Sequence, residues 1–156
     1  MVDRTELIGH LDATQKFFNT TLRCFEDGDG DFAPLPGLLP VKAHVAHVAL
    51  TLDWFVEGAF GSGWDMDFEE ADRQCRAVPS LAEAKQMLDR AFANGKRTIE
   101  QASPDQLAEP IADERILGPA PRAAIIPAIV DHTAHHRGSL AVYARLVGRM
   151  PAMPYM

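Results

Sequence analysis

The segment from Arg122 to Gly148 constrains the fold of this chain more than any other. Its apolar and imidazole side chains recur every three or four residues, a spacing that places them on one face of an α-helix. They are Ile125, Ile129, His132, His136, Leu140, Tyr143 and Val147. The pattern predicts a long helix whose buried face carries two histidines, one turn apart. Pro127 fits only the first turn, so the helix can start after Arg122, and Gly148 fits its end.

Three other segments show the same helical periodicity. They run from about position 3 to 26, from 40 to a cluster of glycines that begins at 58, and from 80 to the Ser-Pro pair at 103. The first and third open at Asp3 and Ser80, each with a glutamate three residues later, as in a capping box. Four amphipathic helices without convincing strand alternation predict an all-α fold, a four-helix bundle.

The connections between these helices are less regular. Residues 27–40 are rich in Gly, Pro and Asp and are predicted to form a loop, and residues 105–121 form a long connection that can hold a short extended piece. Residues 64–79 give no firm assignment. We interpret the acidic run Asp65–Glu70 within them as a solvated face, with the mouth of a cleft as the alternative. The run Asp27–Asp31 lacks the Gly and Glu that a calcium-binding EF-hand loop requires.

Length and composition favour one domain over residues 1–156, large enough to bury a core. The net charge of -7 and the absence of a basic run make nucleic acid an unexpected partner. Neither a membrane span nor a secretory signal is expected, because no apolar run is long enough and the first residues have no basic, apolar leader. Cys24 and Cys75 form no CxxC motif, so we expect reduced, buried or half-buried thiols and a cytoplasmic location.

The histidines carry the chemistry of this sequence. His132 and His136 are predicted on the buried face of the last helix, and His44 and His47 lie in the second predicted helix. A buried imidazole needs a partner for its nitrogens, and that partner is a metal ion, a backbone carbonyl or a carboxylate. A pair four residues apart, facing further histidines on another helix, favours a site of three imidazoles around one metal ion. The sequence leaves both His44 and His47 open as the third ligand.

The neighbours of the pair have simpler interpretations. His135 is rotated by about 100° from His136 on a 3.6-residue helix and is not expected to share the site. Asp131 is either a surface charge or a residue that orients one of the imidazoles through a hydrogen bond. Arg137 is interpreted as a surface or ion-pair residue.

A site of three imidazoles leaves a coordination position open, as in catalytic and ligand-accepting metal centres. Zinc, nickel and iron all accept imidazole nitrogen, so the expected cofactor is a divalent ion of this group. The sequence between the paired histidines is Thr133-Ala134-His135, which lacks the glutamate that serves as general base in the HExxH zinc metalloproteases.

The run His132-xxx-His136-Arg137-Gly138, a histidine on the second of four helices and the closing Gly148-xx-Pro151 resemble the DinB-like superfamily over nearly the whole chain. This superfamily includes the damage-inducible DinB proteins, bacillithiol-dependent transferases and the mycothiol-dependent maleylpyruvate isomerase domain. The resemblance implies helices in up-down-down-up order with one long crossover. It also implies a metal ion held by one histidine of the second helix and two of the fourth.

Carried onto this sequence, the resemblance assigns His132 and His136 as the paired ligands. It favours His47 as the third ligand, because Trp54 and Phe55 follow it as aromatic residues do in the family. His44 remains the alternative, since it lies closer in angle to the apolar stripe of its helix. Ser139 stands where many members carry glutamine, a mild departure that leaves the ligands unchanged.

Two functions are consistent with such a site. The first is a metal-dependent enzyme acting on a small molecule, either a transferase that uses a low-molecular-weight thiol or a hydrolase. The second is a non-catalytic protein of the stress response that binds a metal or a small ligand. Wide apolar helix faces and the resemblance also predict a homodimer.

Overall fold

The computed structural model describes residues 3–155; Met1, Val2 and Met156 lie outside the described residues. Within that range the chain is helical, with an isolated bridge between Pro110 and Pro121 as its one strand-like pairing. The α-helices are α1 (Arg4–Leu22), α2 (Val41–Phe60), α3 (Phe68–Arg76), α4 (Leu81–Gln101), α5 (Pro104–Ala108) and α6 (Ile125–Leu146). Two single turns of 3-10 helix, η1 (Asp27–Asp29) and η2 (Arg122–Ala124), complete the structure. The predicted all-α class is confirmed.

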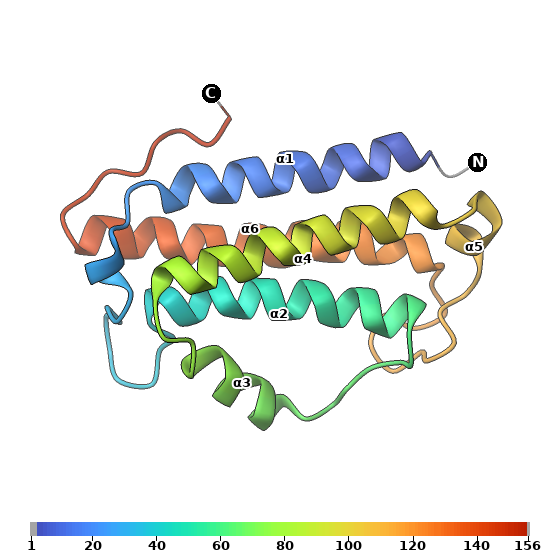
Figure 1. The fold of residues 1–156 in the computed structure, drawn as a ribbon, viewed down its shortest axis with the longest axis horizontal. Coiled ribbons are helices and arrows are strands. Elements are labelled where there is room, and N and C mark those ends of the chain that lie inside the picture. The colour runs from blue at the N-terminus through green and yellow to red at the C-terminus, as the bar shows by residue number, and fades with distance from the viewer. Residues whose placement is uncertain (1–2, 156) are drawn as a thin grey trace.

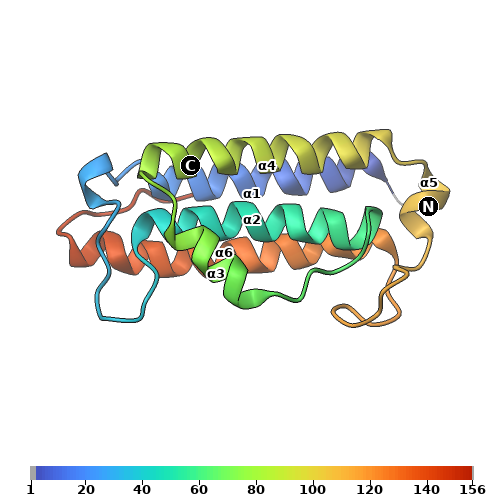
Figure 2. The ribbon, with the colours of Figure 1, turned by 60° about the horizontal axis from the view of Figure 1, so that its bottom comes forward.

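The four long helices α1, α2, α4 and α6 form the predicted bundle (Figure 1). α2 and α4 run in the same direction, and α1 and α6 run in the opposite one, which is the up-down-down-up order. α2 packs against α4 and α6, and α1 packs against the same two helices. Because α2 and α4 are parallel, the chain needs a long crossover between them, and residues 61–80, including α3, form it (Figure 2).

Apolar side chains from all four long helices fill the centre of the bundle. α2 and α4 approach each other closely at Gly95, where a Cβ atom would lie 3.1 Å from Leu52. The almost completely buried side chains include Leu11, Phe18, Leu52, Leu88, Phe92, Ile99, Ile125, Ile126 and Ile129. Burial of this apolar area is the main term that stabilises helices of this length.

The helices differ from the sequence-based prediction in three places: the end of α1 and the two short helices α3 and α5. α1 ends at Leu22, four residues before the predicted end at Glu26, because Phe25 reaches the core from the following turn and not from the helix. The unassigned segment contains α3, which Asp67 caps through a hydrogen bond to the backbone N–H of Glu70. The predicted connection after α4 contains α5, which begins with a proline and a capping box at Ser103.

The ends of α6 agree with the prediction. The α-helix starts at Ile125, after one 3-10 turn, so that Pro127 lies in its first turn, where no backbone donor is required. At the other end Gly148 adopts a φ of 80°, the left-handed conformation that commonly follows a helix.

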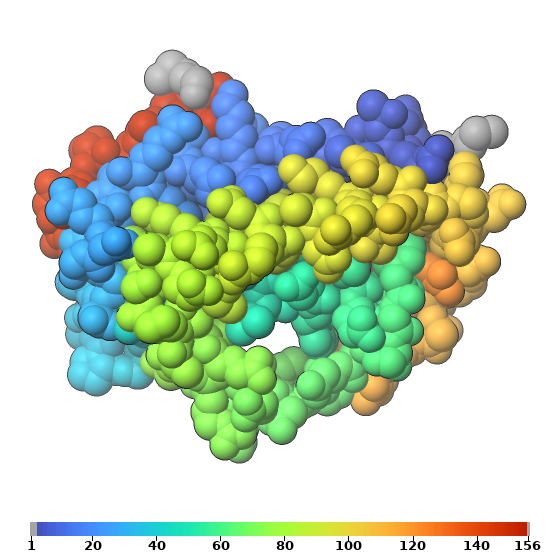
Figure 3. Space-filling model, viewed as in Figure 1, coloured from blue at the N-terminus to red at the C-terminus, as the bar shows by residue number. Residues whose placement is uncertain are grey.

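Trp64 anchors the crossover to the rest of the molecule. Its side chain is 4% exposed, and its indole N–H donates to the backbone oxygen of Asp113 at 2.6 Å. The Arg115 guanidinium returns a hydrogen bond to the Trp64 carbonyl at 3.1 Å. With its first residues fixed in this way, the crossover stands away from α2, and the space-filling view shows an opening between α2 and α3 (Figure 3).

The close contact between Trp64 and Gly58 gives a stability prediction. A Cβ atom on Gly58 would overlap atoms of the Trp64 ring, so Gly58→Ala must displace the indole. We expect a loss of about 1–3 kcal/mol in the free energy of unfolding, the usual result of overpacking, measured by urea denaturation. The matched control is Gly9→Ala on α1, where no atom lies within 4 Å and a gain of about 0.5–1 kcal/mol is expected. Equal stability of Gly58→Ala and wild type would contradict this packing.

Candidate metal centre

Four histidines meet where α2 crosses α6. His44 and His47 are one turn apart on α2, and His132 and His136 are one turn apart on α6. His44 and His136 are buried, whereas His47 and His132 are partly exposed. The antiparallel packing of the two helices therefore brings together residues that are about 90 positions apart in the sequence.

Three of these imidazoles surround one point. His47, His132 and His136 each offer a ring nitrogen, and these atoms all lie within 4.8 Å of one another. The Nε2 atoms of His47 and His132 are 3.1 Å apart. A tetrahedral zinc ion with bonds of about 2.0–2.1 Å would separate its ligand atoms by about 3.3 Å. The three residues therefore fit a divalent ion in type and in spacing.

His44 lies outside this group of three. Its Nδ1 atom is 3.0 Å from Nδ1 of His136, and its Nε2 atom is 3.3 Å from the hydroxyl oxygen of Tyr143. Both ring nitrogens of His44 thus have partners within the protein. Of the two α2 histidines that the sequence left open, His47 is the one that the fold places with His132 and His136.

Burial keeps these imidazoles neutral. It lowers the pKa of His44 and of His132 to about 4, and that of His136 to about 2; nearby imidazoles add to each effect. The pKa of His47 is also lowered, again mainly by burial. Neutral imidazole is the form that binds metal ions, so the site needs no deprotonation at neutral pH.

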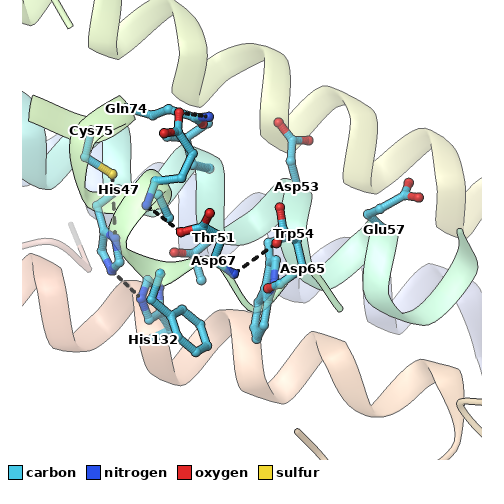
Figure 4. Close-up of a pocket in the computed structure, with 14 residues that line it drawn as sticks. His47, Thr51, Asp53, Trp54, Glu57, Asp65, Asp67, Gln74, Cys75 and His132 are labelled. Atoms are coloured by element: carbon cyan, nitrogen blue, oxygen red, sulfur yellow. Dashed lines mark hydrogen bonds between the residues drawn. The ribbon is translucent and has the colours of Figure 1, made fainter. Parts of the chain in front are cut away.

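A cavity of about 420 Å³ opens beside the group, between α2, α3 and the crossover, and His47 and His132 form one end of it (Figure 4). Its walls combine aromatic, acidic and small side chains. Besides the two histidines they are Leu50, Thr51, Asp53, Trp54, Glu57, Asp65, Asp67, Phe68, Glu70, Ala71, Gln74 and Cys75. The volume is that of a site for a small molecule.

The charge of the cavity wall is negative. Its titratable groups other than histidine and cysteine are five carboxylates, and none of the lining residues described is a lysine or an arginine. Three of the carboxylates, Asp65, Asp67 and Glu70, come from the acidic run that the sequence suggested as a solvated face or as the mouth of a cleft. They are partly or fully exposed and also line the cavity, so both interpretations hold.

Cys75 of α3 lies beside the group of three imidazoles, next to His47. Its side chain is 1% exposed, and Sγ lies 3.9 Å from Nδ1 of His47, on the side of the ring away from His132 (Figure 4). Burial raises the pKa of the thiol to about 11, so it is a neutral partner for His47 and a poor nucleophile. The prediction of a small buried thiol is confirmed, but its place beside the histidines could not be predicted while α3 was unassigned.

The residues next to the histidine pair lie away from the cavity. His135 and Asp131 are exposed, and among residues 3–155 Asp131 has no hydrogen bond to an imidazole. Arg137 packs over the rings of Phe17 and Tyr155, at 6.0 and 5.7 Å from their centroids. It therefore attaches the C-terminal segment to α1, which agrees with a role outside the site.

The fold and the site define a class of protein: a bundle of four long helices with facing histidines on the second and the last of them. The sequence model of the DinB superfamily matches residues 10–140, and the chain belongs to that superfamily. The resemblance inferred from the histidine motif is thus confirmed. No curated protein matches the sequence.

A solved structure has the same fold. The chain superposes on the crystal structure of a conserved protein from Enterococcus faecalis with a TM-score of 0.64. The match covers 93% of this chain and 96% of the other, at 21% sequence identity. At that identity the similarity concerns the fold.

None of the helices within residues 3–155 combines the length and the apolar character that a membrane span requires.

The lowered pKa values predict how the metal-free protein responds to acid. An unfolded histidine has a pKa of about 6.5 and takes up a proton below that pH, whereas the folded protein resists protonation until about pH 4. Stability should therefore be complete above about pH 6.5 and fall as the pH is lowered toward 4. Denaturation midpoints in urea at about pH 7.5 and pH 5, with chelator present, measure this loss.

Two variants test whether the cluster causes the loss. His136→Gln removes the imidazole with the lowest pKa and should weaken the dependence on pH. His10→Asn, on the exposed surface of α1, should show the wild-type profile. A wild-type midpoint that is unchanged between the two pH values would contradict the neutral, buried state of the histidines.

Proposed function

We propose that His47, His132 and His136 bind one divalent metal ion and that the protein is a metal-dependent enzyme acting on a small molecule. The observation that carries the proposal is the convergence of three neutral imidazoles at the end of a cavity. Three protein ligands leave a coordination position open. The cavity adjoins His47 and His132, so we infer that this position faces the cavity.

The ion, when bound, supplies Lewis acidity to a water molecule or a thiol that enters the cavity. The residues of the chain supply binding and orientation. Trp54 and Phe68 offer apolar surface to a substrate, and the carboxylates of the wall disfavour substrates that carry several negative charges. A hydrolase and a transferase that uses a low-molecular-weight thiol of low negative charge both satisfy these conditions.

A second function, binding without catalysis, is favoured by the state of the acidic side chains. Hydrogen bonds from Ser62 lower the pKa of Glu57, and those from Gln74 and Arg73 lower the pKa of Glu70. Asp67 is engaged as the cap of α3. Glu57 and Glu70 are therefore weak bases at neutral pH, and the thiol of Cys75 is neutral. Weakly basic side chains at these positions suit a metal or small-ligand binding protein of the stress response.

We further propose a zinc, nickel or iron ion, a homodimer and a cytoplasmic location. Zinc, nickel and iron all suit three imidazole ligands, and the choice among them depends on the metals that the cell supplies. A homodimer is supported by exposed apolar side chains at the end of α6 and in the following segment, namely Val142, Leu146, Met150 and Met153. A cytoplasmic location stays a prediction, which the free thiols of Cys24 and Cys75 support.

Metal stoichiometry tests the ligand assignment. We expect native mass spectrometry of the zinc- or nickel-loaded protein to show one ion per chain. His132→Ala should abolish stoichiometric binding, because two imidazoles hold a divalent ion poorly, and should leave the helical circular dichroism unchanged, because apolar burial holds the helices. His135→Ala, at the exposed neighbouring position, is the matched control and should bind normally. One ion per chain in His132→Ala would contradict the assignment.

Activity measurements then separate the two functions. The same proteins are screened with ester substrates and with thiol-transfer substrates, with and without chelator. An enzyme of the proposed type is active in wild type and His135→Ala, inactive in His132→Ala, and restored by the ion after chelation. Activity that survives both chelator and His132→Ala would contradict a metal-dependent mechanism. Full metal loading without activity on either class of substrate would favour the binding protein.

A further inference from the structure

A chain of hydrogen bonds reaches Nδ1 of His136. The hydroxyl of Tyr143 donates to the backbone oxygen of Leu39 at 3.2 Å. The same hydroxyl lies 3.3 Å from Nε2 of His44, and Nδ1 of His44 lies 3.0 Å from Nδ1 of His136. The two imidazoles and the phenol are all buried. The chain therefore links Leu39, two residues before the start of α2, to one of the proposed metal ligands.

The acceptor at the far end fixes the direction of these hydrogen bonds. A backbone carbonyl can only accept, so the single proton of the Tyr143 hydroxyl points at Leu39. The hydroxyl oxygen then accepts from His44, which places the proton of His44 on Nε2. A neutral imidazole has one N–H, so Nδ1 of His44 is an acceptor. The proton between the two histidines consequently belongs to Nδ1 of His136.

We propose that Tyr143 and His44 are positioning residues that hold His136 in its Nδ1–H tautomer and so direct the lone pair of its Nε2 toward the metal ion. This inference rests on the proposed function of the site. It gives His44, which is not one of the three converging histidines, a defined role. The opposite direction would place the proton on Nε2 of His136, and that proton would have to leave before Nε2 could bind a metal ion.

This role explains why position 44 carries a histidine. The position requires a donor on one edge of the side chain and an acceptor on another, and a neutral imidazole provides both. Partners that fix the tautomer of a ligating histidine typically change metal affinity by about 10–100-fold when they are removed. Tyr143 contributes one hydroxyl to the chain, while its ring packs edge-on against Phe32 and His44.

The first test measures the tautomer in metal-free protein, by ¹⁵N NMR of the histidine rings. We expect His136 of the wild type to be protonated on Nδ1. Tyr143→Phe keeps the ring and removes only the hydroxyl, so His136 should become a mixture of both tautomers. Tyr155→Phe, the same change at the other tyrosine of the chain, should leave the spectrum unchanged. Protonation of His136 on Nε2 in the wild type would overturn the proposal. So would a tautomer of His136 that is the same in Tyr143→Phe as in the wild type.

The second test measures zinc affinity by competition with a chelator. His44→Phe removes the acceptor and should weaken binding by about 10–100-fold. His44→Asn places an amide oxygen where Nδ1 of the imidazole was, so it should stay within a few-fold of wild type. Affinity in His44→Phe equal to that of wild type would overturn the role of His44. The Tyr143→Phe spectrum decides the proposal where His44→Phe fails to fold.

The two tests separate this inference from the proposed function. Wild-type protein that binds no zinc but shows His136 protonated on Nδ1 contradicts the metal site and leaves the hydrogen-bond chain supported. Wild-type protein that binds zinc with His136 protonated on Nε2 in the metal-free state supports the site and contradicts the chain.

Discussion

The antiparallel packing of α2 against α6 is the interaction on which the site depends. Each helix by itself carries two imidazoles on an apolar stripe, and such a stripe is costly to bury without partners. Packing the two stripes together gives each imidazole a neighbour on the other helix: His47 faces His132, and His44 faces His136. The hydrophobic core around these contacts fixes the helices, so the imidazoles are arranged before any ligand binds.

The sequence was sufficient for the parts of the structure that follow from local periodicity. The four long helices, the late start of α6 after Arg122 and the pairing of His132 with His136 all come from spacing within one segment. The choice between His44 and His47 depends on how α2 is rotated against α6, which a periodicity pattern does not specify. α3 was not assigned, because a short helix with mostly charged side chains has no apolar stripe to detect.

The surroundings of the proposed ligands were the least predictable part of the site, because they come from segments far apart in the sequence. Cys75 of α3 contacts His47 of α2. The backbone oxygen of Leu39, which precedes α2, accepts a hydrogen bond from Tyr143 of α6. Both contacts involve atoms that the sequence presents as an ordinary thiol and an ordinary backbone group. Cys75 is a partner of His47, and the Leu39 carbonyl is connected to His136 through Tyr143 and His44, in the manner of the outer partners that metal ligands commonly have.

In the proposed site three imidazoles, without the nearby thiol, hold the metal ion. X-ray absorption spectroscopy of the zinc-loaded protein tests it most directly, because nitrogen and sulfur neighbours differ in distance and scattering. We expect only light-atom neighbours at about 2.0–2.1 Å, with the outer-shell scattering of three imidazole rings. A sulfur neighbour at about 2.3 Å, which Cys75 would supply, or the signal of fewer than three imidazoles would contradict it.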